Sequence, residues 1–485
     1  MAANSPVSPS NPVSQLRTRG VFCNRTLNLR GIKAIGYDMD YTLIHYHIEV
    51  WEKRAYEYAR ERLAQGGWPI ERLQFDSALV SRGCIIDKEL GNIVKADRFG
   101  FVKAAAHGTR TLDFPELREK YARTLVDLRD ARWEFLNTFF SISVGCLFSQ
   151  GVDLLDAREL PSVLGYQDVF RHVQRALDAA HIEGRLKAEI IRDPTTFVDL
   201  DPDLADTLLD QRDAGKKLLL ITNSEWHYTD AMLRWVFERP GSPVARWRDL
   251  FDMVLVQARK PDFFLGTQPA FEIISDNGDL RPVAPGAKLL VDSGRCYYGG
   301  NASLIESALG LQGQDILYVG DHIFADVHVS KRTVRWRTAL VLREIEDDVR
   351  ALDAFRDHER RLRALMEQKT TLEREVAVLR LDLQRRRNQR SPISDQTIAA
   401  IENELETKKS ALAELDHSIA PLAEEATRLT HPRWGPTMRA GIDKAHIARQ
   451  IERYADIYFS RVSNFRWATP FAYFRPPKSS LPHDL

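Results

Sequence analysis

With 485 residues, the chain can bury more than one hydrophobic core, so we expect a main domain together with a large insertion or an appended module. Its 68 basic and 68 acidic residues balance, which excludes a global electrostatic field that recruits nucleic acid or an anionic membrane surface. The 4 cysteines are far apart and lack metal-site spacing, which favours free thiols in a reducing compartment.

The first segment, residues 1–20, contains Asn, Ser and Pro and lacks the continuous apolar stretch of a secretory signal, so we expect a disordered lead-in. No apolar run in the sequence is long enough to cross a membrane as a helix. The sequence therefore predicts a cytoplasmic protein that binds neither nucleic acid nor a membrane.

Two carboxylates follow the first strand that the sequence predicts. The apolar run 32–37 is typical of a buried strand, and it stops at Asp38 and Asp40, with Thr42 beyond them. One carboxylate of such a pair can attack phosphorus, while the second protonates the leaving oxygen and later activates water. A D-x-D sequence alone is more often a solvated turn, so this chemistry requires further groups from the rest of the chain.

The next segment, residues 51–199, does not continue a parallel α/β repeat, and we interpret it as an inserted cap. Helical spacing over 51–65 is followed by short strands and glycine turns between about 75 and 115. Residues 115–180 are expected to be mostly helical.

An aromatic stretch at residues 133–140 lies within the predicted cap. Its Trp and Phe residues favour an assignment to the cap core. The alternative is a binding site in which Arg129, Asn137 and Phe140 present a guanidinium, an amide and an aromatic face to a planar ligand.

A later strand ends in groups that suit a phosphate. The apolar run 217–221 follows an expected helix at 206–214 and leads into Thr222, Asn223 and Ser224. Hydroxyl and amide groups at a strand end can donate to phosphate oxygens without adding charge. A helix cap is compatible with the same residues.

The following strand ends near a lysine. The run 251–256 leads to Lys260, and Pro261 favours an extended backbone there, from which an ammonium can reach a phosphate or a carboxylate. A single lysine is usually a surface residue, but its position after a third such strand favours a role in the site.

The last acidic pair follows a strand predicted at 315–319. Gly320 permits a tight turn, and Asp321 and Asp326 flank the expected start of the next helix, close enough to share a hard cation such as Mg²⁺. A further strand is predicted at 336–342.

This ordered set of strand ends resembles the haloacid dehalogenase (HAD) superfamily of phosphohydrolases and phosphotransferases. The finer resemblance is to the cytosolic purine 5′-nucleotidase family (IMP/GMP-specific). It is carried by Asp38–Thr42, Ala258–Pro261 and Ile316–Phe324, with further similarity in 21–27, 106–108, 136–138 and 453–456. The resemblance covers most of residues 20–350 and 440–483.

The resemblance implies the catalytic roles. Asp38 is expected to be the nucleophile and Asp40 the general acid/base, and both are expected to surround Mg²⁺ together with Asp321 and Asp326. The remaining catalytic and phosphoryl-binding residues implied by the family are Thr222, Lys260, Asn223 and Ser224.

The resemblance also implies partners. In the family, a basic residue, an Asn and an aromatic residue of the cap hold the purine nucleoside monophosphate, which implies Arg129, Asn137 and Phe140 here, although the Arg129 correspondence requires a small gap. Members also bind adenine nucleotides at an effector site, whose location the sequence does not give. A homo-oligomer, either a dimer or a tetramer, is expected.

The predicted fold class is α/β: a HAD-like Rossmannoid parallel sheet with helices on both faces, an inserted α+β cap and a C-terminal antiparallel helical hairpin. The core is expected to comprise residues 21–50 and 200–350, and residues 431–485 are expected to dock on it.

Residues 351–430 depart from the family pattern. Apolar residues follow a 3,4 spacing in two segments, with Lys369 and Lys408 as the polar members, and a basic turn around Ser391 and Pro392 separates them. Two helices of matching period joined by a polar loop predict an antiparallel coiled-coil hairpin. The arginines of the turn are more typical of a solvated tip than of a nucleic-acid site.

The sequence thus favours an Mg²⁺-dependent 5′-nucleotidase for purine nucleoside monophosphates, with IMP and GMP preferred and phosphotransfer to a second nucleoside as an additional activity. A HAD phosphatase for another small metabolite is one alternative. A nucleotide-sensing interaction protein that works through its hairpin is the other, and the complete set of charged motif residues argues against it.

Overall fold

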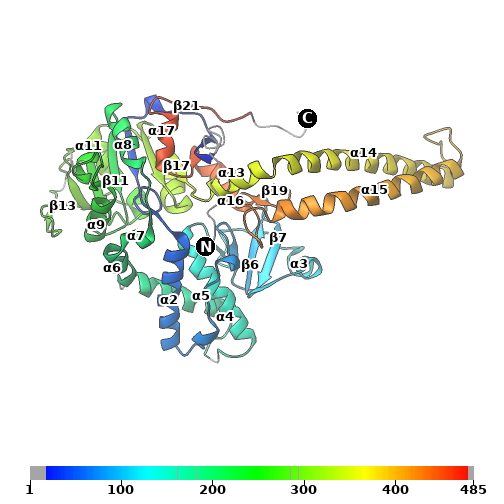
Figure 1. The fold of residues 1–485 in the computed structure, drawn as a ribbon, viewed down its shortest axis with the longest axis horizontal. Coiled ribbons are helices and arrows are strands. Elements are labelled where there is room, and N and C mark those ends of the chain that lie inside the picture. Colours follow the sequence, from blue (N-terminus) through cyan, green and yellow to red (C-terminus); the bar gives the residue numbers. More distant parts are fainter. Residues whose placement is uncertain (1–17, 161, 183, 285, 293, 479–485) are drawn as a thin grey trace, which may run out of the picture. The chain divides into compact units, whose positions relative to one another are not determined.

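The computed structural model describes residues 18–478 apart from 161, 183, 285 and 293. The described chain forms two compact units, one made of the residues up to Glu346 and from Thr437 on, the other of residues 347–436 (Figure 1). Most of the predicted lead-in, residues 1–17, lies outside the described part. No helix in the described part is long and apolar enough to cross a membrane.

A ten-stranded sheet forms the centre of the first unit. Its order is β1 (Val21–Cys23), β20 (Ile457–Phe459), β17 (Arg337–Val341), β16 (Ile316–Gly320), β3 (Ala34–Tyr37), β11 (Lys217–Ile221), β12 (Met253–Val256), β15 (Cys296–Gly299), β13 (Ala270–Ile273) and β14 (Leu280–Pro282). Strands β20 to β15 run parallel to their neighbours, and the outer pairs are antiparallel. The predicted α/β class with a parallel central sheet is confirmed.

The predicted core strands are present, and several other strands were not anticipated. Strands β3, β11, β12, β16 and β17 lie where apolar runs predicted them. Strands β13, β14, β15 and β20 were not predicted from the sequence. Strand β20 joins the C-terminal segment to the sheet by parallel pairing with β17.

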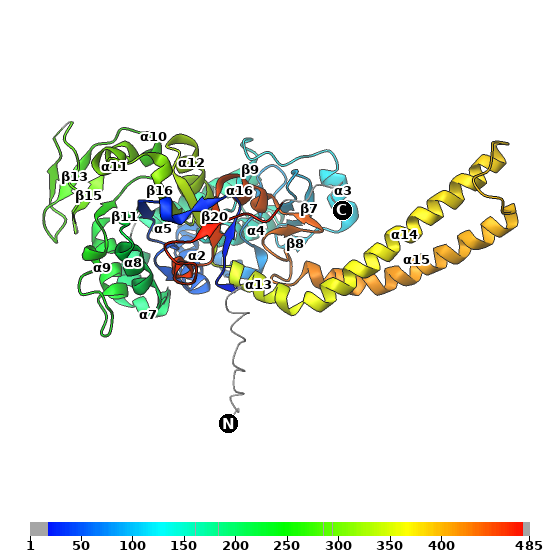
Figure 2. The same ribbon diagram turned by 90° about the horizontal axis from the view of Figure 1, so that it is seen from above.

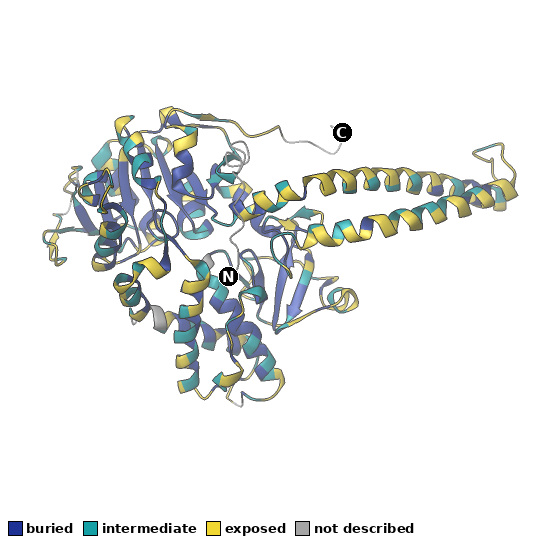
Figure 3. Ribbon diagram, viewed as in Figure 1, coloured by how far each residue is buried: buried dark blue, intermediate teal, exposed yellow. Residues whose placement is uncertain are grey.

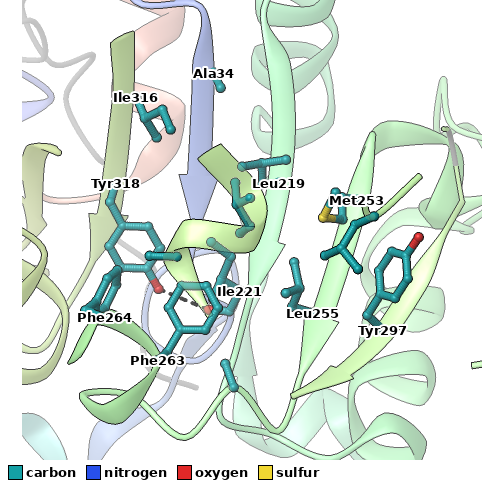
Figure 4. Close-up of a cluster of buried hydrophobic side chains, with 14 of the residues drawn as sticks. Ala34, Leu219, Ile221, Met253, Leu255, Phe263, Phe264, Tyr297, Ile316 and Tyr318 are labelled. Atoms are coloured by element: carbon teal, nitrogen blue, oxygen red, sulfur yellow. Dashed lines mark hydrogen bonds between the residues drawn. The ribbon is translucent and has the colours of Figure 1, made fainter. Parts of the chain in front are cut away.

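Aromatic side chains fill part of the hydrophobic core of the first unit. Figure 4 shows Phe263, Phe264 and Tyr318 packed together, and Figure 3 shows the central strands of the sheet as buried. A Cβ at position 36 would lie 2.9 Å from a ring carbon of Tyr318. The absence of a side chain at Gly36 therefore leaves room for this ring against β3. The Tyr318 hydroxyl donates to the carbonyl oxygen of Ile221 at 3.0 Å (Figure 4).

Helices connect and flank these strands. The α-helices of the first unit outside the cap are α8 (Leu204–Asp213), α9 (Trp226–Phe237), α10 (Asp262–Leu265), α11 (Ala302–Leu309), α12 (Val329–Thr333), α16 (His446–Tyr454) and α17 (Phe465–Ala468). A π-helix, η7 (Ile323–His328), follows β16. Asp321 and Asp326 flank its start, as predicted, and Asp326 lies in its first turn.

The cap segment contains its own antiparallel sheet and a helical layer. The sheet has the order β8 (Arg110–Thr111), β7 (Val102–His107), β6 (Asn92–Ala96), β5 (Ile85–Asp87) and β9 (Trp133–Phe135). The helices are α2 (Ile48–Gln65), α3 (Phe114–Tyr121), α4 (Ile142–Asp156), α5 (Tyr166–Ile182), α6 (Arg185–Arg192) and α7 (Pro194–Phe197).

Residues 115–180 are mostly helical, as predicted, but the aromatic stretch at 133–140 begins with a strand instead of an α-helix. Strand β9 pairs with β5, and a 3₁₀-helix, Phe139–Ser141, follows. Pairing with the edge of the cap sheet satisfies the backbone of this stretch and overrides its apolar pattern, which by itself does not distinguish a helix from a short buried strand.

The second unit contains the predicted helical hairpin. Helices α14 (Arg356–Arg387) and α15 (Ile398–Thr427) lie side by side in both views (Figures 1 and 2). The buried members of their seam are Val376, Leu383, Ile401 and Leu405. The polar members of the pattern form ion pairs between the helices: Lys369 contacts Asp416 at 2.5 Å and Lys408 contacts Glu375 at 2.7 Å.

The tip of the hairpin is closed by a buried carboxylate. Asp382 accepts hydrogen bonds from the backbone of Ile393 and from the hydroxyl of Ser394, and Arg386 pairs with the same carboxylate. One of the arginines of the predicted basic turn therefore stabilises the loop rather than facing a ligand.

Candidate active site

The motif residues meet at the carboxyl edge of the parallel sheet. Strand β3 lies between β16 and β11, and β12 follows β11, so the loops after these strands are neighbours in space. Asp38 leaves β3, Thr222 leaves β11 and Asp321 leaves β16. Parallel strands bring their carboxyl ends to one edge, which is where open α/β sheets bind ligands.

Lys260 is the central cation of this edge. Its Nζ lies 2.8 Å from Asp38 Oδ1 and 2.8 Å from Asp326 Oδ1, and it donates to the hydroxyl of Tyr318 at 3.0 Å. Burial by itself lowers the pKa of Lys260, but the carboxylates of Asp326 and Asp38 reverse this effect and raise the pKa well above its usual value. The side chain therefore carries a positive charge in a buried position.

Three carboxylates lie close enough to share a metal ion. Oxygen atoms of Asp38, Asp321 and Asp326 lie within 4.8 Å of one another. Gly320 permits this approach, because a Cβ at that position would lie 2.5 Å from Asp326 Oδ2. Burial raises the pKa of Asp38 to about 7, and burial together with neighbouring Asp326 raises the pKa of Asp321 well above its usual value.

The same cluster fits a hard cation. Asp321 Oδ2 is buried and has no hydrogen-bond partner among the described residues. Lys260 supplies only one positive charge to the three carboxylates, so a divalent cation would balance their charge and restore their ionised forms. Carboxylate oxygens are the ligands that Mg²⁺ prefers.

Asp40 lies beside this cluster but is held by hydroxyl groups. Its Oδ1 accepts a hydrogen bond from the Tyr46 hydroxyl at 2.5 Å, and its Oδ2 accepts one from Ser224 Oγ at 2.6 Å. The carboxylate cluster in the described residues does not include Asp40. A side-chain metal contact of Asp40 therefore stays a prediction, whereas a separate role in proton transfer suits its surroundings.

The loop after β11 holds the lysine loop in place. Asn223 Nδ2 donates to the carbonyl oxygen of Lys260 at 3.1 Å, and the Lys260 amide donates to Asn223 Oδ1 at 2.6 Å. Thr222 Oγ1 accepts from the Ser224 amide at 3.0 Å. Thr222, Ser224 and Lys260 thus share one buried loop cluster, and the side chain of Asn223 fixes the backbone of that cluster.

The three cap residues that were predicted to bind the purine lie in different surroundings. The Phe140 ring packs edge-on against Tyr41 at 4.7 Å and against Trp51 at 5.4 Å, next to the D-x-D loop. Asn137 donates to the carbonyl oxygen of Phe135 at 3.3 Å. The side chain of Arg129 is 90% exposed and pairs with Asp127, so it does not join the buried cluster.

Several residues that support the site were not predicted from the sequence. They are Tyr46, Tyr228, Tyr318, Arg82 and Lys187. Arg82 connects the core to the cap, since it donates to the carbonyl oxygens of Asp321 at 2.6 Å and of Asn137 at 2.8 Å. Lys187 brings a second ammonium to within 3.4 Å of Ser224 Oγ. Apart from Tyr318, which lies within the 316–324 stretch, these residues have no local motif, because each reaches the site from a different element.

The profile of the 5′ nucleotidase family matches residues 21–485. The chain belongs to this 5′ nucleotidase family. A 5′-nucleotidase domain-containing protein of Dictyostelium discoideum is 23% identical over 497 residues, covering 100% of this chain and 78% of that protein. The match spans both the sheet and the hairpin of this family member.

Solved structures to which this chain shows some similarity include an archaeal β-phosphoglucomutase from Pyrococcus, with 11% identity, a TM-score of 0.29 and coverage of 64% of this chain and 87% of that one. A haloacid dehalogenase-like hydrolase from Xanthomonas campestris has 12% identity, a TM-score of 0.25 and coverage of 64% and 82%. These scores are low, and the fold assignment stands on the sheet order of this chain itself.

The geometry and the family agree on a coarse activity. A member of the 5′ nucleotidase family that places a lysine-paired aspartate, a second aspartate and an acidic cluster at one strand edge is a HAD-like phosphohydrolase. Its acidic cluster has the ligands to bind a metal ion.

Proposed function

We propose that the protein is an Mg²⁺-dependent 5′-nucleotidase that hydrolyses purine nucleoside 5′-monophosphates, with IMP and GMP preferred, through an aspartyl-phosphate intermediate. The observation that carries the proposal is the buried pair of Asp38 and Lys260 at the strand edge, with Asp40 held separately by hydroxyl groups. The preference for IMP and GMP rests on the family resemblance of the motifs.

In the first step, Asp38 attacks phosphorus. A bond forms between the carboxylate oxygen and phosphorus while the bond from phosphorus to the nucleoside 5′ oxygen breaks. Asp40 donates its proton to that 5′ oxygen, so the nucleoside leaves as a neutral alcohol. Lys260 lies 2.8 Å from Asp38 and can neutralise charge on the incoming phosphoryl oxygens.

In the second step, water hydrolyses the aspartyl phosphate. Asp40, now ionised, takes a proton from the water as its oxygen attacks phosphorus, and Asp38 departs as a carboxylate. Inorganic phosphate leaves, and both aspartates have returned to their starting forms. A nucleoside 5′-hydroxyl in place of the water would give phosphotransfer by the same exchange of bonds.

The metal and phosphoryl contacts follow from the same cluster. Asp38, Asp321 and Asp326 are the residues that would hold Mg²⁺, and the bound ion would supply positive charge that reduces repulsion between the nucleophile and the phosphate. Thr222 and Ser224 would donate hydrogen bonds to phosphoryl oxygens.

For the purine, we assign Phe140 and Asn137 as the cap contacts, with Arg129 as the family-based third residue. Phe140 is the member whose surroundings support the assignment best, since its ring lies against Tyr41 beside the D-x-D loop. The proposal also includes a cytoplasmic location, a homo-oligomer and a nucleotide effector, all of which follow from the sequence and the family resemblance.

A substrate panel tests this function. Phosphate release is measured from IMP, GMP, AMP, pyrimidine monophosphates and sugar phosphates, each with Mg²⁺ and with EDTA. The expected result is the highest kcat/KM for IMP and GMP and loss of activity in EDTA. A preference for sugar phosphates would replace the nucleotidase by another HAD phosphatase, and no release from any ester would favour a nucleotide-sensing role.

A further inference from the structure

A chain of hydroxyl groups ends on the carboxylate of Asp40. Tyr46, on β4 (His45–Tyr46), donates to Asp40 Oδ1 at 2.5 Å, and its own oxygen lies 2.9 Å from the hydroxyl of Tyr228 on α9. Ser224 Oγ reaches the other carboxylate oxygen at 2.6 Å. Each oxygen of Asp40 is therefore held by a side chain from a different element.

The order of donors and acceptors among these hydroxyl groups follows from the number of hydrogen atoms that each can donate. A tyrosine hydroxyl has one proton to donate. When Asp40 is ionised, the Tyr46 hydroxyl donates its one hydrogen bond to the carboxylate. The Tyr46 oxygen therefore has to accept a hydrogen bond from Tyr228. Tyr228 then supports Tyr46 and reaches Asp40 only through it.

The tyrosines are suited to hold a fixed position. Tyr46 and Tyr228 are both buried, and the Tyr46 ring packs against Trp51 at 4.4 Å and Tyr41 at 5.2 Å. A packed aromatic ring has few rotamers, so its hydroxyl fixes Oδ1 more firmly than a serine can fix Oδ2. Ser224 can turn about its Cβ when a substrate enters, and Lys187 already lies 3.4 Å from its oxygen.

We infer that Tyr46, supported by Tyr228, is a positioning residue that orients the Asp40 carboxyl for proton transfer to the leaving group. The inference rests on the proposed function, since it concerns the general acid of that reaction. It assigns to these tyrosines no contact with the reacting atoms. It also explains why the hydroxyls of two buried tyrosines from distant parts of the sequence form one hydrogen-bonded chain that ends on a carboxylate outside the acidic cluster.

The test uses two esters that differ in their need for a proton. A nucleoside 5′-monophosphate releases a strongly basic alkoxide, which needs protonation, whereas p-nitrophenyl phosphate releases a weakly basic phenolate, which does not. In the full-length protein with Mg²⁺, Tyr46→Phe is expected to lower the rate of inosine release from IMP in a single turnover by about 10- to 100-fold, the range that a misplaced catalytic group gives. The rate of p-nitrophenol release in the first turnover and the affinity for IMP should stay near the wild-type values. The first turnover is compared because the second step, in which Asp40 activates water, is the same for both esters.

One further variant tests whether Tyr228 acts on Asp40 only through Tyr46, and a second serves as a control. Tyr228→Phe should have a smaller effect in the same direction, and it should add nothing in the Tyr46→Phe background, because Tyr228 acts through Tyr46. Tyr56→Phe is the matched control: it removes another buried tyrosine hydroxyl, which donates to Gln150 at 2.5 Å within the cap. It should affect both esters equally or not at all.

The outcomes separate this inference from the proposed function. Equal losses in the first-turnover rates of the two esters would show that Tyr46 acts through stability or packing, and an unchanged first-turnover rate for IMP would show that it does not position Asp40. Either result overturns the inference and leaves the nucleotidase assignment intact. If the wild-type protein releases no phosphate from either ester, both the proposed function and the inference fail.

Discussion

The strand-end cluster and the cap residues differ in how firmly the fold assembles them. At the strand ends, Lys260 contacts Asp38 and Asp326 at 2.8 Å each, and the three residues follow β12, β3 and β16 of the same parallel sheet. In the cap, Phe140 packs beside the D-x-D loop, but the side chain of Arg129 is 90% exposed.

The difference shows what a sheet can fix and what an inserted segment cannot. A parallel sheet places the residues after neighbouring strands at one edge, so the chemistry depends only on strand order. Cap residues reach the site through loops, whose positions depend on longer-range packing. The reaction class is therefore better defined by this structure than the substrate.

The largest effect is expected from Asp38→Asn. The change preserves the shape of the side chain and removes the attacking charge, so turnover of IMP should be abolished while nucleotide binding survives. Activity is measured by phosphate release and binding by calorimetry, both with Mg²⁺. Substantial turnover in this variant would place the nucleophile elsewhere.

Removal of the central cation is expected to affect stability in a metal-dependent way. Lys260→Met leaves buried carboxylates unpaired, a change that typically costs about 3–5 kcal/mol. Thermal unfolding in EDTA should show a large loss, and Mg²⁺ should restore part of it, because the ion would balance the same charges.

Lys217→Met is the control for this prediction. Lys217 pairs with Asp252 at 2.8 Å, but its side chain is 53% exposed, and such pairs contribute only about 0–1 kcal/mol. An Mg²⁺ response of equal size in both variants would separate the metal from the Lys260 cluster.

The cap side of the comparison is tested by two substitutions. Phe140→Ala removes an aromatic face and should raise KM for IMP by about tenfold, the effect of roughly 1–1.5 kcal/mol from an aromatic contact. Arg129→Ala should raise KM by a smaller factor, about threefold, because a contact made by an exposed charged group contributes little. A tenfold increase in KM for Arg129→Ala would show that the cap closes on the nucleotide through this residue.

The smallest effect on activity is expected from loss of the hairpin. Residues 347–436 form a unit of their own, and replacement of 354–426 by a short flexible linker should leave a folded protein with detectable activity. Light scattering should show a changed oligomeric mass if the hairpin serves assembly. Unchanged mass together with lost activity would show that the hairpin supports the active site instead.

Sequence patterns predicted the parts of the fold that depend on local order. The apolar runs before Asp38, Thr222 and Asp321 identified the central strands, and the 3,4 spacing identified α14 and α15. The patterns did not predict β9, because a short apolar stretch fits a helix or a strand until its pairing partner is known.

The charged residues of the site could be predicted from the sequence, but the residues that hold them in position could not. The acidic and basic residues of the motifs follow strands, so their meeting could be anticipated from strand order alone. The hydroxyls of Tyr46, Tyr228 and Tyr318 could not, because nothing in the sequence tells which buried tyrosine reaches a carboxylate or an ammonium. Tertiary packing alone decides such contacts.

The central claim, that Asp38 carries the phosphoryl group, is most directly tested by a burst experiment on Asp40→Asn. This variant keeps the nucleophile but cannot activate water, so hydrolysis of the intermediate should slow by about 10²–10⁴-fold. With p-nitrophenyl phosphate and Mg²⁺, we predict a rapid release of one p-nitrophenol per active site, followed by slow turnover. The burst should be absent from Asp38→Asn combined with Asp40→Asn. Steady release without a burst, or a burst that persists in the double variant, would contradict the account.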